Sequence, residues 1–427
     1  MINQFPVSTK KIEFFTHNGF RKILPNGCTA HQALAPVILL GQIFSIMPIT
    51  GYFHSHGPLG LKFKMKSIQL IYSSLTMTSV LSIVIMFLIH SIQREKIGLN
   101  SAGTLIYYIV ILTTMIEFVL LAYNWRSIMI QWTEAEAPFL YGPYATGKGV
   151  PLESLVRRVA FTVTLFAFLE DTMNFLSAYK LNKLHIKQCP HASDFWYSFY
   201  HREHPHIVRL IPYHPAVGVV IEATMRVAKF TWNYGDMFIM SVCLTLQRRL
   251  QQFNDGLERL AGTEQSQVRW RQVRLDFLRL NELIRMLDEK LSRIILMSCA
   301  NDMFFISVQL YNIFDVKPTL FTTFYYWYSL LFLMGRCVLM LYITSSIYEE
   351  SLKPLRLLRA IPTQNWNLDL QRLVNHVSLK NSAFSGKRFF YITRSLILAM
   401  AGTIITYELV LLDQVAKDKD NTLDCNY

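Results

Sequence analysis

Hydrophobic residues occur along this chain in long runs that are separated by polar and basic segments. Seven of these runs are long enough to cross the roughly 30 Å hydrocarbon core of a bilayer, which takes about 20 residues of α-helix. They are residues 67–92, 104–123, 155–178, 213–246, 294–314, 320–347 and 389–414. The pattern predicts an all-α polytopic membrane protein with seven transmembrane helices.

An eighth apolar run, residues 31–52, is interrupted by Pro36, Gln42, Pro48 and Gly51. These residues favour a helix that lies in the membrane interface or re-enters it, because proline and glycine disrupt a continuous helix. A crossing is the alternative. Counting it as a span would reverse the side of the N-terminal tail and leave the sides of the later loops unchanged.

The charged residues orient the predicted helices. Hydrophobic residues make up 52% of the chain and charged residues only 17%, below the quarter that is usual in soluble domains. The net charge of +13 does not indicate nucleic-acid binding, because the basic residues adjoin hydrophobic runs. Segments 1–66, 124–158, 247–293 and 348–394 contain 29 Lys and Arg, against 10 in segments 93–103, 180–211, 315–319 and 415–427. The positive-inside rule therefore predicts a cytoplasmic N-terminus and an extracellular C-terminus, opposite to a G-protein-coupled receptor.

The same assignment divides the chain into domains. Residues 1–66 form a cytoplasmic N-terminal segment, and residues 415–427 form an extracellular tail. In residues 247–293, Leu and Ile recur at steps of three and four with charges between them. This amphipathic spacing predicts that the fourth and fifth spans continue into a cytoplasmic helical extension. Two solvated helices without a partner are the alternative, and residues 348–388 form a further cytoplasmic segment.

Polar and aromatic side chains inside the apolar runs are candidates for a ligand site, because polar groups in hydrocarbon are costly unless they face protein or water. The candidates are Tyr107, Glu170, Asp171, Asn174, Trp232, Asp236, Asp302, Gln309, Tyr325, Tyr326 and Trp327. Most fall in the outer half of the membrane in the predicted orientation. Carboxylates and amides beside aromatic rings suit a neutral polyhydroxylated ligand. An interfacial aromatic belt with interhelical hydrogen bonds explains the same residues without a ligand.

The outer segment between the third and fourth spans is rich in histidine, including His201, His204 and His206. Nothing in the spacing fixes a tetrahedral geometry, so we expect a polar loop and no metal. Cys189 in this segment and Cys425 in the tail both lie on the oxidising side, which makes a disulfide between them plausible. We find no catalytic or nucleotide-binding motif, and expect neither an enzyme nor a cofactor.

The last run carries polar residues that a plain membrane anchor does not need. Thr406, Tyr407 and Glu408 lie within it, and Asp413 and Gln414 lie at its end. The helix therefore either packs among other helices or lines a hydrated path.

Several segments resemble insect gustatory receptors, and specifically the sugar-receptor branch grouped with the trehalose receptor. They are TYELVLLDQ (406–414), YYWYSLLFLMGR (325–336), SGKRFFYITRSL (385–396), TWNYGDMFIM (231–240), LMSCANDMFF (296–305) and HQALAPVILLGQIFSIMP (31–48). The resemblance covers nearly the whole chain. Where the family has Gln and Phe at the end of the first of these motifs, this chain has Asp413 and Gln414.

The resemblance implies a sugar-gated, non-selective cation channel acting as a sweet-taste receptor in the plasma membrane of chemosensory neurons. It implies a mono- to trisaccharide ligand, permeant monovalent cations and Ca²⁺, and a homotetramer or heteromer embedded in membrane lipid. The seventh helix would line the pore through Thr406, Tyr407, Val410, Asp413 and Gln414. In a tetramer, Asp413 would place a ring of carboxylates near the outer pore mouth. The alternative is that Asp413 faces extracellular water. A secondary transporter for a small polar solute and a G-protein-coupled receptor are the alternatives.

Overall fold

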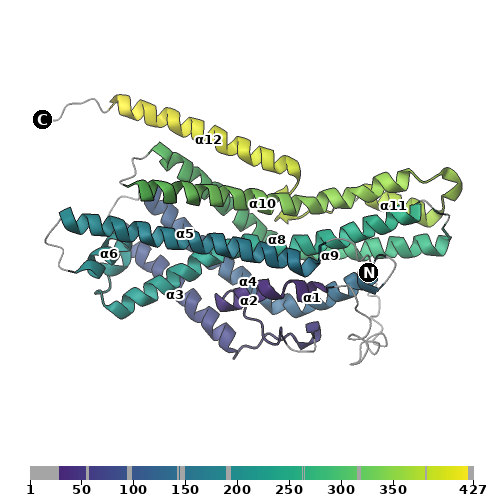
Figure 1. Ribbon diagram of the computed structural model, residues 1–427, viewed down its shortest axis with the longest axis horizontal. Coiled ribbons are helices and arrows are strands. Elements are labelled where there is room, and N and C mark those ends of the chain that lie inside the picture. Colours follow the sequence, from purple (N-terminus) through teal and green to yellow (C-terminus); the bar gives the residue numbers. More distant parts are fainter. Residues whose placement is uncertain are drawn as a thin grey trace.

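The regular structure of the chain is almost entirely helical (Figure 1). The computed structural model describes residues 28–53, 57–93, 99–141, 144, 150–188, 194–261, 263, 265–314, 319–379 and 382–421. Seven long helices are α3 (Ile68–Gln93), α4 (Leu99–Tyr141), α5 (Leu152–Gln188), α8 (Pro215–Ala261), α9 (Gln267–Tyr311), α10 (Leu320–Arg359) and α12 (Arg394–Asn421). Helix α8 packs most extensively against α10, α4 packs against α9, and α5 packs against α8.

Four of the described helices, α3, α4, α9 and α10, contain stretches long and apolar enough to cross a membrane. The apolar part of α12 that the structure describes, Arg394–Thr406, is shorter. The predicted spans in α5 and α8 do not reach this criterion. Length and composition therefore establish a multi-pass helical protein, and the seven-span arrangement stays a prediction.

The long helices extend well past the predicted spans. Helix α4 continues 18 residues beyond the predicted end at 123, and α10 continues to Arg359. Helix α8 continues through the predicted extension to Ala261, and α9 begins again at Gln267 and continues through its other half. The 3₁₀ turn η4 (Thr363–Asn365) follows α10 and leads into α11 (Leu368–Leu379). Helix α11 packs against α9 and α10 at the end of the elongated molecule that these extensions form (Figure 1).

The N-terminal apolar run forms two short helices, α1 (Ala30–Ala33) and α2 (Ala35–Ile43). Thr29 caps α1 through a reciprocal capping box with Gln32, which satisfies free backbone N–H groups at the helix start. At about 1.5 Å per residue, the nine residues of α2 cover less than half of a bilayer core. The helix expected over 31–52 thus ends at Ile43, and the chain then turns at Gly51, whose φ of +80° favours glycine.

Short elements complete the two ends of the bundle. The 3₁₀ turn η2 (Gly57–Gly60) precedes α3, and η3 (Asn312–Phe314) ends α9. Helices α6 (Phe195–Glu203) and α7 (Pro205–Val208) lie at the end opposite α11, where α6 packs on α5 and α7 packs on α3 (Figure 1). The outer segment expected to be a polar loop is therefore partly helical and packed.

The last helix begins five residues later than its apolar run predicts. The two-residue strands β1 (Ser385–Gly386) and β2 (Phe390–Tyr391) pair in an antiparallel hairpin, and the two residues of its turn with positive φ are Lys387 and Arg388. These backbone angles interrupt a helix, so α12 starts at Arg394. The predicted pore helix 389–414 is thus shifted to 394–421.

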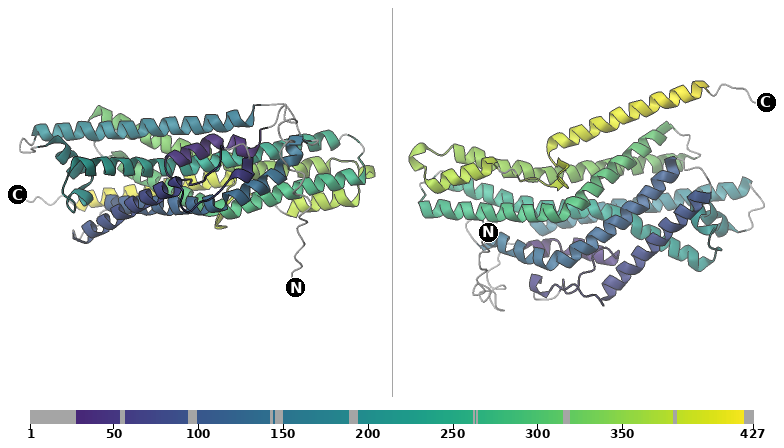
Figure 2. Two further views of the ribbon diagram at one scale, coloured as in Figure 1. Left: turned by 90° about the horizontal axis from the view of Figure 1, so that it is seen from below. Right: turned by 180° about the vertical axis from the view of Figure 1, so that it is seen from behind.

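Helix α12 projects away from the bundle over most of its length (Figures 1 and 2). It packs against α9 and α10, whereas Leu398, Ile405 and Leu409 are 77%, 61% and 63% exposed. An isolated apolar helix in this position needs lipid or another protein surface to cover it.

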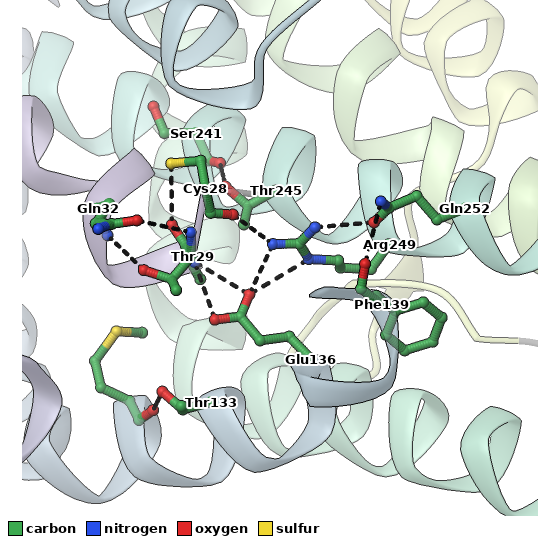
Figure 3. A network of polar contacts seen from close by, with 12 residues as sticks. Cys28, Thr29, Gln32, Thr133, Glu136, Phe139, Ser241, Thr245, Arg249 and Gln252 are labelled. Carbon is green, nitrogen blue, oxygen red and sulfur yellow. Dashed lines mark hydrogen bonds and ion pairs between the residues drawn. The ribbon is translucent and has the colours of Figure 1, made fainter. Parts of the chain in front are cut away.

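A buried ion pair fixes the N-terminal segment to the bundle (Figure 3). The Arg249 guanidinium of α8 lies 3.0 Å from the Glu136 carboxylate of α4, and the two side chains are 3% and 0% exposed. Arg249 also donates to the Cys28 carbonyl at 2.7 Å, and Glu136 accepts from the Ala30 N–H at 3.1 Å. The pair thus joins α1, α4 and α8.

We expect Arg249→Met to destabilise the fold by about 3–5 kcal/mol, because it leaves the Glu136 carboxylate buried without its cation. Thermal unfolding of the purified chain and limited proteolysis of residues 28–53 measure the effect. The matched control is Arg157→Met, which removes an exposed pair with Glu153 at 3.7 Å worth at most about 1 kcal/mol. Equal unfolding temperatures for the two variants would contradict the assigned role.

Candidate functional site

A buried charged cluster lies where α8, α9 and α10 meet. The Arg336 guanidinium of α10 contacts the carboxylates of Asp236 on α8 at 2.6 Å and Asp302 on α9 at 3.3 Å. It also donates to the Asn233 side chain, and Ser298 donates to Asp236. Arg336 is 3% exposed and both aspartates are fully buried. Two predicted site residues from different helices are therefore held by one cation.

Aromatic rings surround this cluster. The Trp232 indole N–H donates to Asp302 at 2.9 Å, and its ring lies 5.0 Å from the Arg336 guanidinium carbon. The Tyr107 ring of α4 packs edge-on against Trp232 at 6.0 Å and against Phe305 at 5.9 Å. Edge-on packing stabilises buried aromatic rings, and a cation–π contact stabilises a guanidinium that is shielded from solvent. Tyr107 and Trp232 thus lie beside the charged cluster.

A second polar group adjoins the first, two helical turns away along α10. Ser329 donates to the Glu170 carboxylate of α5 at 2.6 Å and accepts from the Gln309 side chain of α9 at 3.3 Å. Tyr326 donates to the Gln309 carbonyl, and Tyr325 lies next to Ser329 and Glu170. Four of the predicted residues therefore form one polar group with Ser329, three through Ser329 itself and Tyr326 through Gln309.

Several buried polar atoms in these two groups have no hydrogen-bond partner among the described residues. They are the Tyr107 hydroxyl, Asp302 Oδ2 and Gln309 Oε1. Both side-chain polar atoms of Asn301, the residue before Asp302 on α9, are likewise buried without a partner among the described residues. Nearly all buried polar atoms in proteins are paired, so a cluster of unpaired ones indicates a place where water or a polar ligand binds. Donors and acceptors are both present, which matches the chemistry of hydroxyl groups.

The remaining predicted residues lie elsewhere. Asp171 on α5 pairs with Arg226 at 3.1 Å and Lys229 at 2.8 Å on α8, a separate ion cluster that also includes Glu222. The half-buried Asn174 lies one turn further along α5. Trp327 is 45% exposed and lies outside both polar groups. The structure thus groups eight of the eleven candidates and separates these three.

The five predicted pore residues all lie on α12. Thr406 is exposed and donates to the Gly402 carbonyl at 2.9 Å. The backbone of α12 includes Tyr407, Val410, Asp413 and Gln414, whose side chains lie outside the described part of the structure. Cys189 and Cys425 also lie outside the described residues.

Sequence reasoning missed Arg336 and Ser329, the two residues at the centres of the polar groups. Arg336 is a cation midway along an apolar run, and such a residue is costly enough to indicate a buried partner. That signal was available. Ser329 carries no comparable signal, because serine is common in transmembrane helices and is uncharged. Arg226 pairs with Glu222 within α8 and also bridges to Asp171 of α5.

Two histidines of the segment between α5 and α8, His204 and His206, pack against aromatic rings. The described residues contain no cluster of three or more His, Cys, Asp or Glu side chains that could hold a metal ion. His206, 4% exposed, packs edge-on against Phe87 of α3 at 5.2 Å and lies 6.0 Å from His204. Burial, reinforced by His90, lowers the pKa of His206 to about 4. Burial, with His206 and Lys229 nearby, lowers the pKa of His204 to about 3.

A family model described as trehalose receptor matches residues 17–425 of this chain. The "Gustatory receptor for sugar taste 64a" of Drosophila melanogaster is 31% identical over 389 residues, which cover 90% of this chain and 84% of that protein. The "Gustatory receptor 5a for trehalose" of the same organism is 29% identical over 408 residues, which cover 96% of this chain and 90% of that protein. The named relatives are receptors rather than enzymes.

A solved structure with a similar fold is that of the insect olfactory receptor OR5 from Machilis hrabei in complex with eugenol. The TM-score is 0.65 at 13% sequence identity, with 89% of this chain and 97% of that chain covered. This likeness establishes that the chain has the insect chemoreceptor fold.

We expect the contact between α7 and α3 to weaken in acid. The pKa of His206 is about 4 in the fold, below the ordinary value of 6.5, so protonation favours the open state. The stability of this contact is complete above pH 6.5 and falls as the pH drops toward 4, by on the order of 2 kcal/mol at pH 5. Hydrogen exchange of residues 195–208 at pH 7.5 and pH 5, corrected for intrinsic rates, measures the loss.

The variant His206→Phe keeps the packing on Phe87 and removes one of the two titrating imidazoles, so its protection should change less with pH than that of the wild type, with His204 accounting for the remaining change. His185→Phe, at an exposed position on α5, is the control and should behave like the wild type. Unchanged protection of the wild type between the two pH values would refute the expectation.

Proposed function

The chain belongs to the trehalose receptor family, and from that premise we propose that it is a sugar-gated, non-selective cation channel acting as a gustatory receptor. The names of the relatives associate them with sugar taste and with trehalose. The insect chemoreceptor fold supports the same reading. The observation in this chain that carries the proposal is the group of enclosed, unpaired polar atoms beside aromatic rings between α4, α8 and α9.

The proposed ligand is a mono- to trisaccharide. Its hydroxyl groups would donate to Asp302 Oδ2 and Gln309 Oε1, and the Asn301 amide would supply a donor and an acceptor. The rings of Tyr107 and Trp232 offer apolar faces for the C–H surface of a pyranose. An anionic ligand fits poorly, because Asp236, Asp302 and Glu170 place three carboxylates near one guanidinium.

Binding would reach the proposed pore through α9. Asp288 of α9 accepts from the Ser385 N–H at 2.6 Å and from its hydroxyl at 3.1 Å, which fixes the β1–β2 hairpin that leads into α12. A shift of α9 relative to α10 would therefore move the start of α12. Sugar can open the channel only if it binds the open arrangement more tightly than the closed one.

The proposed arrangement in the membrane follows the charge count. It has seven spans, a cytoplasmic N-terminus and an extracellular C-terminus, in the plasma membrane of gustatory or other chemosensory neurons. The exposed apolar face of α12 supports its placement between copies of the chain in a homotetramer, or between related receptors in a heteromer. Monovalent cations and Ca²⁺ would permeate past Thr406, Tyr407, Val410, Asp413 and Gln414. We also propose that Cys189 and Cys425 form a disulfide on the outer side.

Asp302→Asn and Glu170→Gln are expected to raise the sugar concentration for half-maximal current by about tenfold or more, since hydrogen bonds to charged groups contribute about 1.5–3 kcal/mol. Whole-cell current from cells expressing this chain alone, with a panel of saccharides and a G-protein blocker, measures the effect. The control is Glu153→Gln, a carboxylate in an exposed pair. An unchanged dose response in both test variants, at normal surface expression, would rule out the ligand site.

For the pore, we expect Asp413→Asn to lower the permeability of divalent relative to monovalent cations, because it removes a ring of carboxylates from the proposed outer mouth. Reversal potentials in solutions that exchange Na⁺ for Ca²⁺ measure the ratio. Asp194→Asn, at the cap of α6, is a control of equal charge change. Identical selectivity in all three proteins would place Asp413 off the conduction path.

A further inference from the structure

Between α2 and α3, residues 49–53 and 57–67 form a ledge that includes the 3₁₀ turn η2 and is fixed by backbone and side-chain hydrogen bonds. Thr50 and Lys62 form an antiparallel backbone bridge, with N–H to carbonyl distances of 3.0 and 2.9 Å. The Thr50 hydroxyl adds a bond to the Lys62 carbonyl at 2.7 Å. Gln42 of α2 donates to the Ile49 carbonyl at 2.7 Å, which ties the first part of the ledge to α2. At the other end, the Ser67 hydroxyl accepts from a backbone N–H in the first turn of α3.

This ledge presents three cations that have no ion-pair partner among the described residues. Lys62, Lys64 and Lys66 are exposed, and none forms an ion pair with another residue that the structure describes. Phe63 lies between the first two and packs edge-on against Tyr123 of α4 at 5.6 Å. Because side chains alternate along an extended segment, the inward Phe63 directs its two lysine neighbours outward.

Exposed apolar side chains occupy the same ledge. Met65 is 76% exposed and Ile68, the first residue of α3, is 82% exposed. Residues Ile68–Ile92 of α3 form one of the candidate membrane spans, so the ledge lies where this helix enters the bilayer. Cations beside apolar side chains at that depth match the two parts of an acidic lipid, a phosphate group and acyl chains.

We propose that the ledge is a docking site for an anionic phospholipid. The ammonium groups of Lys62, Lys64 and Lys66 bind the headgroup, while Met65 and Ile68 contact the acyl chains. In the proposed orientation this lipid belongs to the cytoplasmic leaflet, which is rich in acidic headgroups. The site lies apart from the charged cluster around Arg336 and does not depend on the proposed sugar response.

The test uses the full chain, purified in a neutral detergent, and dioctanoyl phosphatidylserine as the probe. Dioctanoyl phosphatidylcholine serves as the neutral lipid, and glycerophosphoserine as the headgroup without acyl chains. Affinities are measured by native mass spectrometry or thermophoresis. The charge variant is K62Q/K64Q/K66Q, and the matched control is K183Q/K187Q/R209Q, three exposed cations near the end of the bundle that carries α6.

We expect phosphatidylserine to bind more tightly than either comparison compound. The charge variant should bind it at least tenfold more weakly, since each lysine near an acidic surface contributes about 1 kcal/mol. The control should bind like the wild type. The variant M65S/I68S should reduce the advantage of the lipid over glycerophosphoserine.

Equal affinity for the two lipids would overturn the proposal, as would an equal loss in the control variant. Glycerophosphoserine binding as tightly as the lipid would indicate a free phosphate site instead. If the triple variant does not fold, the affinity of K64Q for phosphatidylserine and a salt titration of wild-type binding replace it. Binding to exposed cations weakens as salt screens them. Binding that is insensitive to salt and to K64Q would then refute the docking site.

Discussion

The rest of the bundle depends on one constraint, which is that a charge placed among apolar helices must be neutralised by protein. Arg336 meets it with two aspartates from two other helices, Asp236 on α8 and Asp302 on α9. Removing one partner of such a group leaves an unpaired buried charge, at a cost of about 3–5 kcal/mol. The three helices are therefore held in one relative arrangement, and the unpaired polar atoms beside them keep fixed positions. A ligand that meets preordered groups loses less conformational entropy on binding.

A second buried pair applies the same constraint further along the bundle. Arg249 and Glu136 join α8 to α4 and also bind the backbone of residues 28–30 (Figure 3). Helix α8 thus carries both fixed points, Asp236 near its middle and Arg249 between three and four turns later. Because a helix transmits displacement along its axis, movement at the charged cluster around Arg336 would reach the N-terminal segment and the ledge that follows it.

The sequence predicted the helical class, the approximate positions of the long helices and most residues of the polar groups. These features follow from hydrophobic run length and from the cost of polar groups in apolar surroundings. It did not predict the β1–β2 hairpin, whose two-residue strands leave no periodic pattern, and so it placed the start of α12 five residues early. The adjacent residues Glu170 and Asp171 face different sides of one helix, but the sequence did not show that Asp171 meets α8 and Glu170 meets Ser329 of α10. Which neighbour each residue faces depends on how the helices pack, and composition does not specify that.

The position of α12 relates this architecture to a channel. The other long helices pack against several neighbours, whereas α12 packs mainly against α9 and α10 and exposes an apolar face beyond them. A helix that contributes little to the stability of its own subunit can move at low energetic cost. Its start is nonetheless tied to α9 by the contact between Asp288 and Ser385, on the same helix that carries Asn301, Asp302 and Gln309. Helix α9 would therefore join the proposed ligand contacts to the start of α12, and such a connection is the minimum needed to couple binding to opening.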